Sequence, residues 1–164
     1  MVDSLKQIRR AIGAIDKEID KVCSGFSEYP VLLSIPGFGP DISARVLAAI
    51  GNPSRFENQR QLLKMAGLDL SAKRSGESSN RAVPVISKKG KADLRYVLYQ
   101  AALIASTRNP YFAIYFADKL KGREKEKGIK TKMRIKLSGK LLVIAWTLMK
   151  KEEYFNPRYL KLDS

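Results

Sequence analysis

A proline–glycine turn between two apolar segments constrains the fold of this chain more than any other feature of its 164 residues. The turn is Pro36-Gly37-Phe38-Gly39-Pro40, followed by Asp41. Glycine reaches backbone angles closed to other residues, and proline with a following acid suits the first turn of a helix. The sequence therefore predicts a short helix, a sharp turn and a second helix between residues 31 and 50. The apolar face that would hold these helices together is Leu33, Ile35, Val46, Leu47 and Ile50.

Apolar spacing predicts that most of the remaining chain is helical as well. Residues 56–65, 92–106, 111–120 and 133–149 carry apolar side chains three and four positions apart, the period of a helix with one buried face. The stretch 66–87 is polar and basic, and only residues 83–86 are typical of a short strand. In the two longest helices, the residues expected to face the core are Leu94, Val97, Leu98, Ala101 and Ala102, and Leu141, Leu142, Ile144, Ala145 and Leu148. The predicted fold class is mainly α: a helical domain with a helix-hairpin-helix motif, a basic irregular loop and an N-terminal coiled-coil-like helix.

The N-terminal segment carries apolar residues in alternate steps of three and four, the seam of a coiled coil. They are Leu5, Ile8, Ile12, Ile15, Ile19 and Val22. Two interpretations stay open: a helix that packs on its own domain, and a helix that pairs with another segment or another protomer. The predicted domains are this coiled-coil-like helix at 1–24, the helical domain at 25–155 and a tail at 156–164.

The charge of the chain indicates a polyanionic partner. Lys and Arg number 31 against 16 Asp and Glu, a net charge of +15. So large an excess in a short chain opposes compaction through self-repulsion unless a polyanion offsets it. Nucleic acid and an anionic membrane surface are the two candidates. No run of 18 apolar residues occurs, so no membrane span is expected.

The residue content excludes several catalytic chemistries. The chain has no histidine, so it can form neither a Ser-His nor a Cys-His pair, and a zinc site of the usual kind is not expected. Its carboxylates are scattered, which argues against a two-metal nuclease centre, and no metal site is predicted in this chain. Cys23 is the only cysteine, and we interpret it as structural. A single cysteine without a secretory signal favours a reducing compartment, the cytoplasm.

The glycines of the turn also indicate a phosphate contact. Without side chains, Gly37 and Gly39 let backbone N–H groups approach an anion closely, and the N-terminus of the following helix attracts negative charge. Gly37, Phe38 and Gly39 are therefore predicted to bind nucleic acid, in the manner of a helix-hairpin-helix motif that holds the backbone without selecting a sequence. The alternative is a plain connection between two helices with no ligand.

A second basic group lies between residues 73 and 95. The predicted nucleic-acid contacts there are Lys73, Arg74, Gly76, Arg81, Lys88, Lys89, Lys91 and Arg95. Cations spaced through a loop and into a helix suit an irregular phosphate path, and a solvated surface loop is the alternative. Ser75 lies among them, and a serine can attack a phosphodiester where cations stabilise the developing charge. However, Ser-Gly is also a common turn dipeptide, and no general base is near.

An ordered series of short motifs resembles the C-terminal transposase domain of the insertion-sequence one-ten family. The series covers about residues 32–150, and its order is more specific than any single piece. It runs Ser34-Ile35-Pro36-Gly37-Phe38-Gly39-Pro40, Ala48-Ala49-Ile50-Gly51, Arg55-Phe56, Gln61-Leu62, Ala66-Gly67-Leu68, Arg74-Ser75-Gly76, Ile86-Ser87-Lys88-Lys89-Gly90, Leu94-Arg95 and Ala101-Ala102. The resemblance implies a role in DNA transposition and site-specific recombination.

The resemblance also implies partners and a catalytic residue. DNA and a structured guide RNA would be the partners, and Ser75 would be the nucleophile of a covalent link to DNA. An N-terminal ribonuclease-H-like domain with an acidic tetrad and magnesium would precede a coiled coil that ends here, which favours a homo-oligomer formed through the N-terminal helix. None of the acids in this chain matches the tetrad. The chain is therefore expected to lack that domain, to hold no cofactor of its own and to be inactive in recombination alone.

Three hypotheses for the function result. The first is a recombinase domain in which Ser75 attacks a DNA strand while Lys73 and Arg74 offset the charge. The second is a non-catalytic nucleic-acid-binding helix-hairpin-helix module in which Ser75 is a turn residue. The third is a basic helical protein of an RNA-containing assembly.

Overall fold

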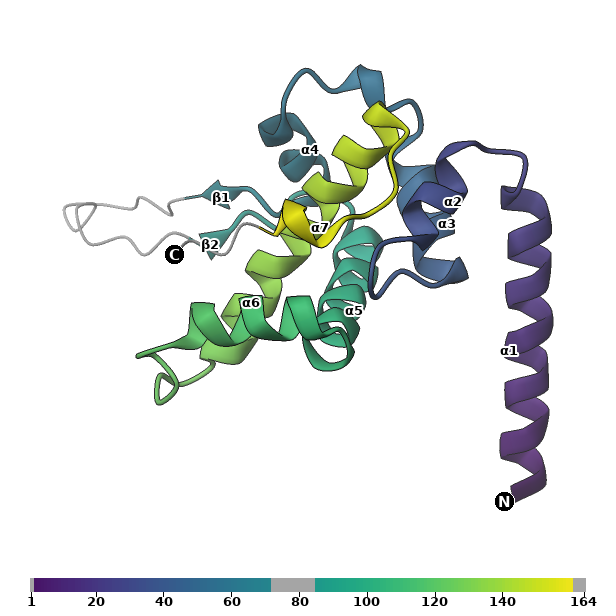
Figure 1. Ribbon diagram of the computed structural model, residues 1–164, viewed down its shortest axis with the longest axis horizontal. Coiled ribbons are helices and arrows are strands. Elements are labelled where there is room, and N and C mark those ends of the chain that lie inside the picture. Colours follow the sequence, from purple (N-terminus) through teal and green to yellow (C-terminus); the bar gives the residue numbers. More distant parts are fainter. Residues whose placement is uncertain (1, 72–84, 161–164) are drawn as a thin grey trace.

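The computed structural model describes residues 2–71 and 85–160. Within them the chain is mainly helical, as predicted (Figure 1). Two-residue strands β1 (Leu70–Ser71) and β2 (Val85–Ile86) pair antiparallel, and single turns of 3-10 helix occupy Pro53–Arg55 and Pro157–Tyr159. The α-helices are α1 (Val2–Cys23), α2 (Glu28–Leu33), α3 (Pro40–Ile50), α4 (Gln59–Ala66), α5 (Ala92–Arg108), α6 (Pro110–Leu120) and α7 (Ile129–Lys151).

Helix α7 forms the centre of the core, because α2, α4, α5 and α6 all pack against it. The core residues predicted for α5 and α7 are all buried, and Phe112 of α6 joins them without any exposed surface. Each large apolar side chain removed from water contributes about 1.5–3 kcal/mol, so this helix assembly supplies most of the driving force for folding.

Helices α4 and α7 begin several residues away from their predicted starts. The side chain of Asn58 accepts a hydrogen bond from the Gln61 N–H at 3.1 Å, so it caps α4, and residues 56–58 precede the helix instead of opening it. Helix α7 begins at Ile129, four residues before the predicted start. The side chain of Ile129 is buried one helical turn before Met133 and extends the same apolar face.

The predicted apolar face between α2 and α3 is right except at Leu33. Ile35, Val46, Leu47 and Ile50 are buried, whereas Leu33 is 38% exposed. Helix α2 has only six residues and turns Tyr29, Val31 and Leu32 towards the core, which leaves Leu33 on its outer side.

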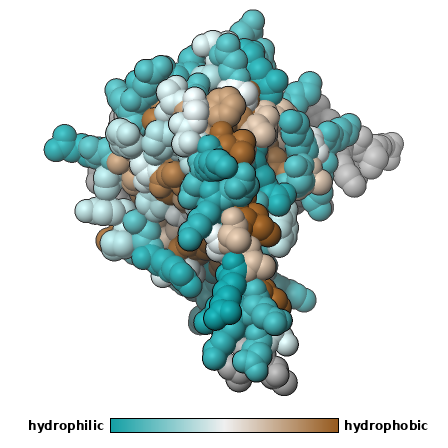
Figure 2. Space-filling view, turned by 90° about the vertical axis from the view of Figure 1, so that its right-hand side faces the viewer, coloured by the Kyte–Doolittle hydropathy of each residue, from teal (hydrophilic) through white to brown (hydrophobic). Residues whose placement is uncertain are grey.

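Helix α1 extends away from the other helices (Figure 1). Its C-terminal end is fastened to α2, because the Tyr29 hydroxyl donates a hydrogen bond to the Asp20 carboxylate at 2.6 Å, and Ile19 and Cys23 pack against the core. The rest of the predicted seam is exposed: Leu5, Ile8, Ile12, Ile15 and Val22. Figure 2 looks onto this side and shows hydrophobic residues bordered by hydrophilic ones along the protruding helix. Within the described residues, α1 therefore packs on its own domain at its C-terminal end, and most of its seam has no partner.

The segment after α7 folds back onto the helices. The Phe155 ring stacks on Phe112 with 5.6 Å between ring centroids, and Leu160 is buried. None of the described helices has a stretch that is long and apolar enough to cross a membrane.

Candidate nucleic-acid interface

The turn between α2 and α3 rests on α5. Gly37 has a φ of +91°, and a Cβ atom added there would lie 2.5 Å from the Ala101 carbonyl oxygen and 3.3 Å from the Ala105 Cβ. The Phe38 N–H donates to the Ile35 carbonyl at 3.0 Å, which closes the turn. Only glycine combines this backbone angle with so close an approach, so the turn is a packed part of the fold.

Phe38 anchors the turn from inside. Its side chain is 5% exposed and belongs to the hydrophobic core, and its N–H is used within the turn. The ring therefore cannot meet a nucleic acid at the surface. This corrects the prediction that placed Phe38 among the contacts, because the neighbouring glycines let the chain bend far enough to turn its ring inward.

Two backbone donors of the turn remain open. Among the described residues, the N–H groups of Gly37 and Gly39 have no hydrogen-bond acceptor, and both glycines are partly exposed. Gly39 is the residue before α3, it supplies no side-chain cap, and a Cβ atom added there would meet nothing within 4 Å. The first turn of α3 therefore faces open space with its dipole and unpaired donors, an arrangement that suits an anion.

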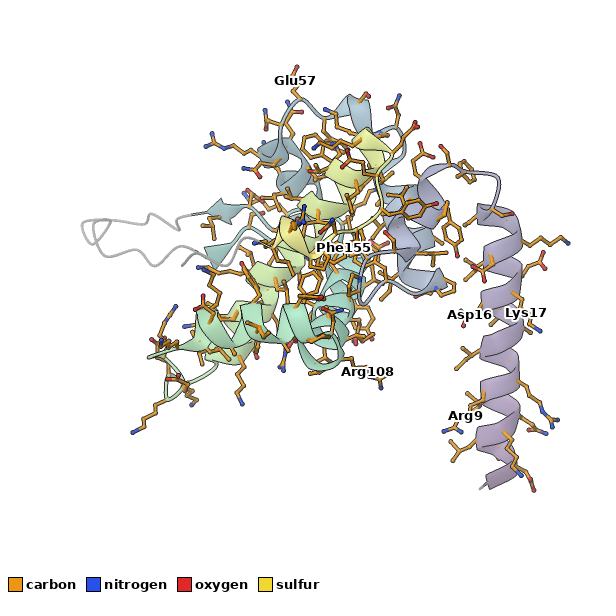
Figure 3. All side chains as sticks on the ribbon, viewed as in Figure 1. Arg9, Asp16, Lys17, Glu57, Arg108 and Phe155 are labelled. Carbon is orange, nitrogen blue, oxygen red and sulfur yellow. The ribbon has the colours of Figure 1, made fainter. Side chains whose placement is uncertain are left out.

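Arg45 lies on α3 and Arg108 on α5, the two helices that meet at the turn, and neither was predicted as a contact. Arg45 Nε donates to the Asp41 carboxylate at 2.8 Å, and this hydrogen bond raises the pKa of the guanidinium, so the side chain stays cationic. Arg108 lies one turn beyond Ala105 on α5 and points away from the helices in Figure 3. The Asp–Arg spacing of four residues was visible in the sequence, whereas the position of Arg108 depends on how α5 packs.

Helix α3 connects the turn with the beginning of α5. At one end Gly37 meets Ala101 of α5, and further along α3 the carboxylate of Asp93 contributes to the raised pKa of Arg45. Because Asp93 lies in the first turn of α5, α3 leads from the turn towards Lys91, which immediately precedes α5.

The segment carrying Lys88, Lys89 and Lys91 is held by its backbone. The Lys88 N–H donates to the Gly67 carbonyl at 3.0 Å, and the Lys91 N–H donates to the Met65 carbonyl at 2.9 Å. Gly67 and Gly90 approach so closely that a Cβ atom on Gly90 would lie 2.3 Å from the Gly67 nitrogen. The side chains of all three lysines are exposed. Their backbone is fixed while their ammonium groups face solvent.

Arg95 has a structural role that the sequence did not indicate. Its Nη1 donates to the Ala66 carbonyl at 3.0 Å and to the Gly90 carbonyl at 2.9 Å, and the residue is half-buried. The guanidinium thus joins the end of α4 to the segment before α5. The phosphate contact predicted for Arg95 stays a prediction. The observed bonds of Nη1 give Arg95 an additional role in positioning the segment that carries Lys88, Lys89 and Lys91.

The remaining predicted residues, Lys73, Arg74, Ser75, Gly76 and Arg81, lie outside the described residues. The structure describes the two strands that flank this part of the chain, with Leu70 opposite Ile86 and Ser71 opposite Val85. The predicted strand at 83–86 is present as Val85–Ile86. Within the described ranges, no group of three or more Cys, Asp or Glu residues is arranged to hold a metal ion.

Comparisons with known proteins give a consistent result. The model of the Transposase IS116/IS110/IS902 family matches residues 29–117. The chain is 33% identical over 161 residues to the pilin gene-inverting protein of Moraxella bovis, which covers 95% of this chain and 48% of that protein. It is 29% identical over 152 residues to the transposase for insertion sequence element IS1111A of Coxiella burnetii, covering 88% and 39%. It is 33% identical over 117 residues to y4rJ of Sinorhizobium fredii, covering 71% and 29%. The chain thus spans half or less of the length of these relatives.

Proposed function

Because this chain belongs to the IS116/IS110/IS902 family of transposases, as the motif series predicted, we propose that it is the DNA-binding C-terminal part of a transposase or recombinase. It would hold the phosphate backbone along the surface that begins at the α2–α3 turn and ends at Lys88, Lys89 and Lys91. Relatives named as a transposase and as a pilin gene inverter support a role in moving or inverting DNA.

The single observation that carries the binding proposal is the open first turn of α3. Its N–H groups are unpaired, Gly39 leaves space in front of them, and the turn is fixed against α5 through Gly37. Fixed donors lose little freedom when an anion binds, so the site is prepared for a phosphate. A helix-hairpin-helix contact of this kind would bind DNA without selecting its sequence.

Substitutions at Gly39 test this proposal without disturbing the fold. Asp and Asn are both favourable residues before a helix, and the space around Gly39 accepts either. Gly39→Asp places a negative charge where the phosphate would lie, whereas Gly39→Asn is nearly the same shape and neutral. We expect Gly39→Asp to weaken binding of a labelled DNA duplex by about tenfold relative to Gly39→Asn. Equal affinities of the two variants would contradict a phosphate contact at the turn.

The exposed lysines are tested by the salt dependence of binding. Each phosphate contact contributes about −0.9 to the slope of log K against log salt concentration. Replacing Lys88, Lys89 and Lys91 with Gln should reduce the slope by about 2 to 3. The matched control removes the same charge from α1, at Arg9, Arg10 and Lys17, and should leave the slope unchanged. A flat salt response of the unaltered protein would contradict a phosphate-dominated interface.

The catalytic part of the proposal rests on the family and on Ser75. The Ser75 hydroxyl would attack a DNA phosphorus and lose its proton, and a phosphoserine ester would form. The bond from phosphorus to one deoxyribose oxygen would break, and that oxygen would take up a proton and leave as a hydroxyl. Attack by another strand's hydroxyl on the ester would release Ser75 and join the strands. Lys73 and Arg74 would offset the charge of the transition state. The proton acceptor and the magnesium would belong to the acidic domain, so this chain alone is expected to bind DNA without recombining it.

Joining the chain to an acidic-tetrad domain allows a test of Ser75. Ser75→Ala should abolish recombination and covalent DNA, and Ser78→Ala, in the same segment, is the control. Covalent DNA that persists in Ser75→Ala would reject the nucleophile and favour the alternative, a non-catalytic binding module.

The remaining partners are also part of the proposal. A structured guide RNA would bind the basic surface together with DNA, and the exposed seam of α1 would pair with a second copy. Good binding of RNA with hardly any binding of DNA would instead favour a basic protein of an RNA-containing assembly.

A further inference from the structure

The turn between α6 and α7 concentrates positive charge away from the α2–α3 turn. Further along α7, Ile135 and Ser138 line a pocket together with Ile86, Ala92 and Arg95. Residues 119–140 contain ten basic and two acidic residues, so these 22 residues hold a net +8 of the total +15. In Figure 1 this turn lies at the far end of α6, on the opposite side of the molecule from α2 and α3. The surface defined by residues 119–140, here called the α6–α7 surface, is unexplained by the contacts proposed above.

Both acids of the α6–α7 surface are already occupied. The Glu126 carboxylate accepts two hydrogen bonds of 2.8 Å from Arg123, which lower its pKa, and Glu124 Oε1 accepts one from the Gly122 N–H at 3.1 Å. Glu126 also interacts electrostatically with Lys132, so these two acids offset only part of the positive charge of this surface. Among the described residues, no ion pair is found for the exposed lysines of this surface, which are Lys121, Lys125, Lys127, Lys130, Lys132 and Lys136.

The backbone beneath these lysines is anchored. Leu120 and Ile129 are buried at the two ends of the turn. Between them, the Arg123 N–H donates to the Leu120 carbonyl at 2.8 Å, and the Ile129 N–H donates to the Glu126 carbonyl at 3.2 Å. The cations are thus fixed in place at their backbone, which lowers the entropy lost when a ligand binds.

Aromatic rings hold further cations close to the α6–α7 surface. Lys140 Nζ lies 4.1 Å from the centroid of the Tyr115 ring, and the Arg134 guanidinium lies 5.4 Å from that of Phe116. These contacts hold the Lys140 and Arg134 side chains against α6, although neighbouring lysines repel them. The fold therefore collects like charges at one end, which costs stability unless a polyanion is bound.

We propose that the α6–α7 surface binds the phosphate backbone of a second nucleic-acid segment, separate from the segment held at the α2–α3 turn. The inference rests on the proposed function in so far as it assigns a nucleic acid as the partner. Repeated charges along a turn and the first turns of a helix fit the repeated charges of a phosphate backbone. DNA and RNA share this chemistry, and the test below distinguishes them.

The test compares two variants with equal loss of charge. The first replaces Lys125, Lys127, Lys130 and Lys132 with Gln, and the matched control replaces Lys6, Arg9, Arg10 and Lys17 on α1, of which Arg9 and Lys17 are labelled in Figure 3. Binding of a labelled DNA duplex, an RNA hairpin and phosphatidylserine vesicles is measured with the full chain across a salt series. We expect the first variant to lose at least about tenfold in nucleic-acid affinity and about 2 to 4 in salt slope, and the control to behave as the unaltered protein.

The outcomes separate this proposal from the proposed function. Loss for DNA alone or RNA alone supports the α6–α7 surface and identifies its ligand. Nucleic-acid binding by the first variant equal to that of the control overturns the second contact and leaves the turn and the lysines before α5 unaffected. Loss of vesicle binding with unchanged nucleic-acid binding overturns it in favour of a membrane surface. Absence of nucleic-acid binding by the unaltered protein overturns both proposals.

The melting temperature of each variant shows whether a loss of binding is caused by unfolding. Removing like charges beside the N-terminus of α7 should leave the melting temperature unchanged or raise it, because cations are unfavourable there. If the fourfold variant unfolds, the double variant Lys125→Gln and Lys127→Gln tests the same contact, because both lysines lie before α7. Its salt slope should fall by half as much.

Discussion

The backbone N–H of Phe155 donates a hydrogen bond of 2.9 Å to the hydroxyl of Ser34, across 121 residues of chain. The same hydroxyl donates to the Val31 carbonyl at 2.6 Å. Ser34 follows α2 directly and opens the turn towards Gly37, while Phe155 stacks on Phe112 in the core (Figure 3). The segment after the last helix thus holds the start of the proposed phosphate-binding turn in place.

Ser34→Ala should destabilise the protein by about 1–2 kcal/mol, because both hydrogen bonds are lost and the Phe155 N–H is left without its acceptor. The free energy of unfolding in urea measures this. Ser27→Ala is a matched control, since its exposed hydroxyl pairs with the neighbouring Glu28 side chain, and it should change stability little. An equal loss of unfolding free energy in Ser34→Ala and Ser27→Ala would show that the hydrogen bond between Ser34 and Phe155 does not stabilise the fold.

Gly37→Ala should cost more than about 2 kcal/mol, because the added Cβ atom collides with the Ala101 carbonyl at a φ of +91°. Gly39→Ala, two residues away, meets open space and should cost only about 1 kcal/mol, the loss expected because alanine is a poorer residue than glycine before a helix. Thermal and urea unfolding of the two variants give the comparison. Similar stability of both would indicate that the turn does not pack on α5 as described.

Arg95→Met should loosen the segment that carries the exposed lysines. The variant keeps the apolar stem but leaves the Ala66 and Gly90 carbonyls without their shared donor, at a cost of about 1–3 kcal/mol. Amide hydrogen exchange at Lys88 and Lys91 should accelerate, because their N–H groups bond to the same stretch of backbone. Lys91→Met, at an exposed side chain, is the control that removes one charge without this effect. Unchanged exchange in Arg95→Met would contradict the positioning role of Arg95.

Tyr29 should make stability depend on pH in the alkaline range. Burial, together with the hydrogen bond to Asp20, raises the pKa of its hydroxyl above the ordinary value of 10.0. The contribution of the neutral phenol is therefore complete below pH 10 and is lost as the pH rises towards the higher folded-state pKa. The difference in unfolding free energy between the unaltered protein and Tyr29→Phe should be about 1 kcal/mol at pH 7 and should shrink above pH 10. A difference that stays constant through this range would contradict the raised pKa.

The exposed seam of α1 should control self-association. Ile8→Asp with Ile12→Asp puts two acids into the seam, whereas Gln7→Asp with Ala14→Asp puts two acids beside it on the same helix. Sedimentation of the unaltered chain should show a concentration-dependent dimer that the first pair abolishes and the second retains. A monomer at all concentrations would favour a helix that pairs with another segment.

Local patterns in the sequence were enough to predict most helices and the core. Leu94, Val97 and Leu98 could be assigned to a buried face from spacing alone, because an apolar helical stripe has few alternatives to burial. The starts of α4 and α7 were missed, since capping by Asn58 competes with the apolar pattern and Ile129 stands apart from it. The apolar spacing also identified the seam of α1, but it does not show which segment or protomer would pair with that seam.

The sequence by itself determined the helical class, the turn at Gly37, the excess of cations and the family. Only the tertiary structure decided which of these residues can meet a ligand. Phe38 and Arg95 are residue types that often occur in nucleic-acid-binding sites. However, the Phe38 ring is buried, and the Arg95 guanidinium donates hydrogen bonds to two carbonyls. Exposure and hydrogen bonding depend on contacts between residues distant in sequence, such as Gly37 with Ala101 and Arg95 with Ala66, and a local pattern does not contain those contacts.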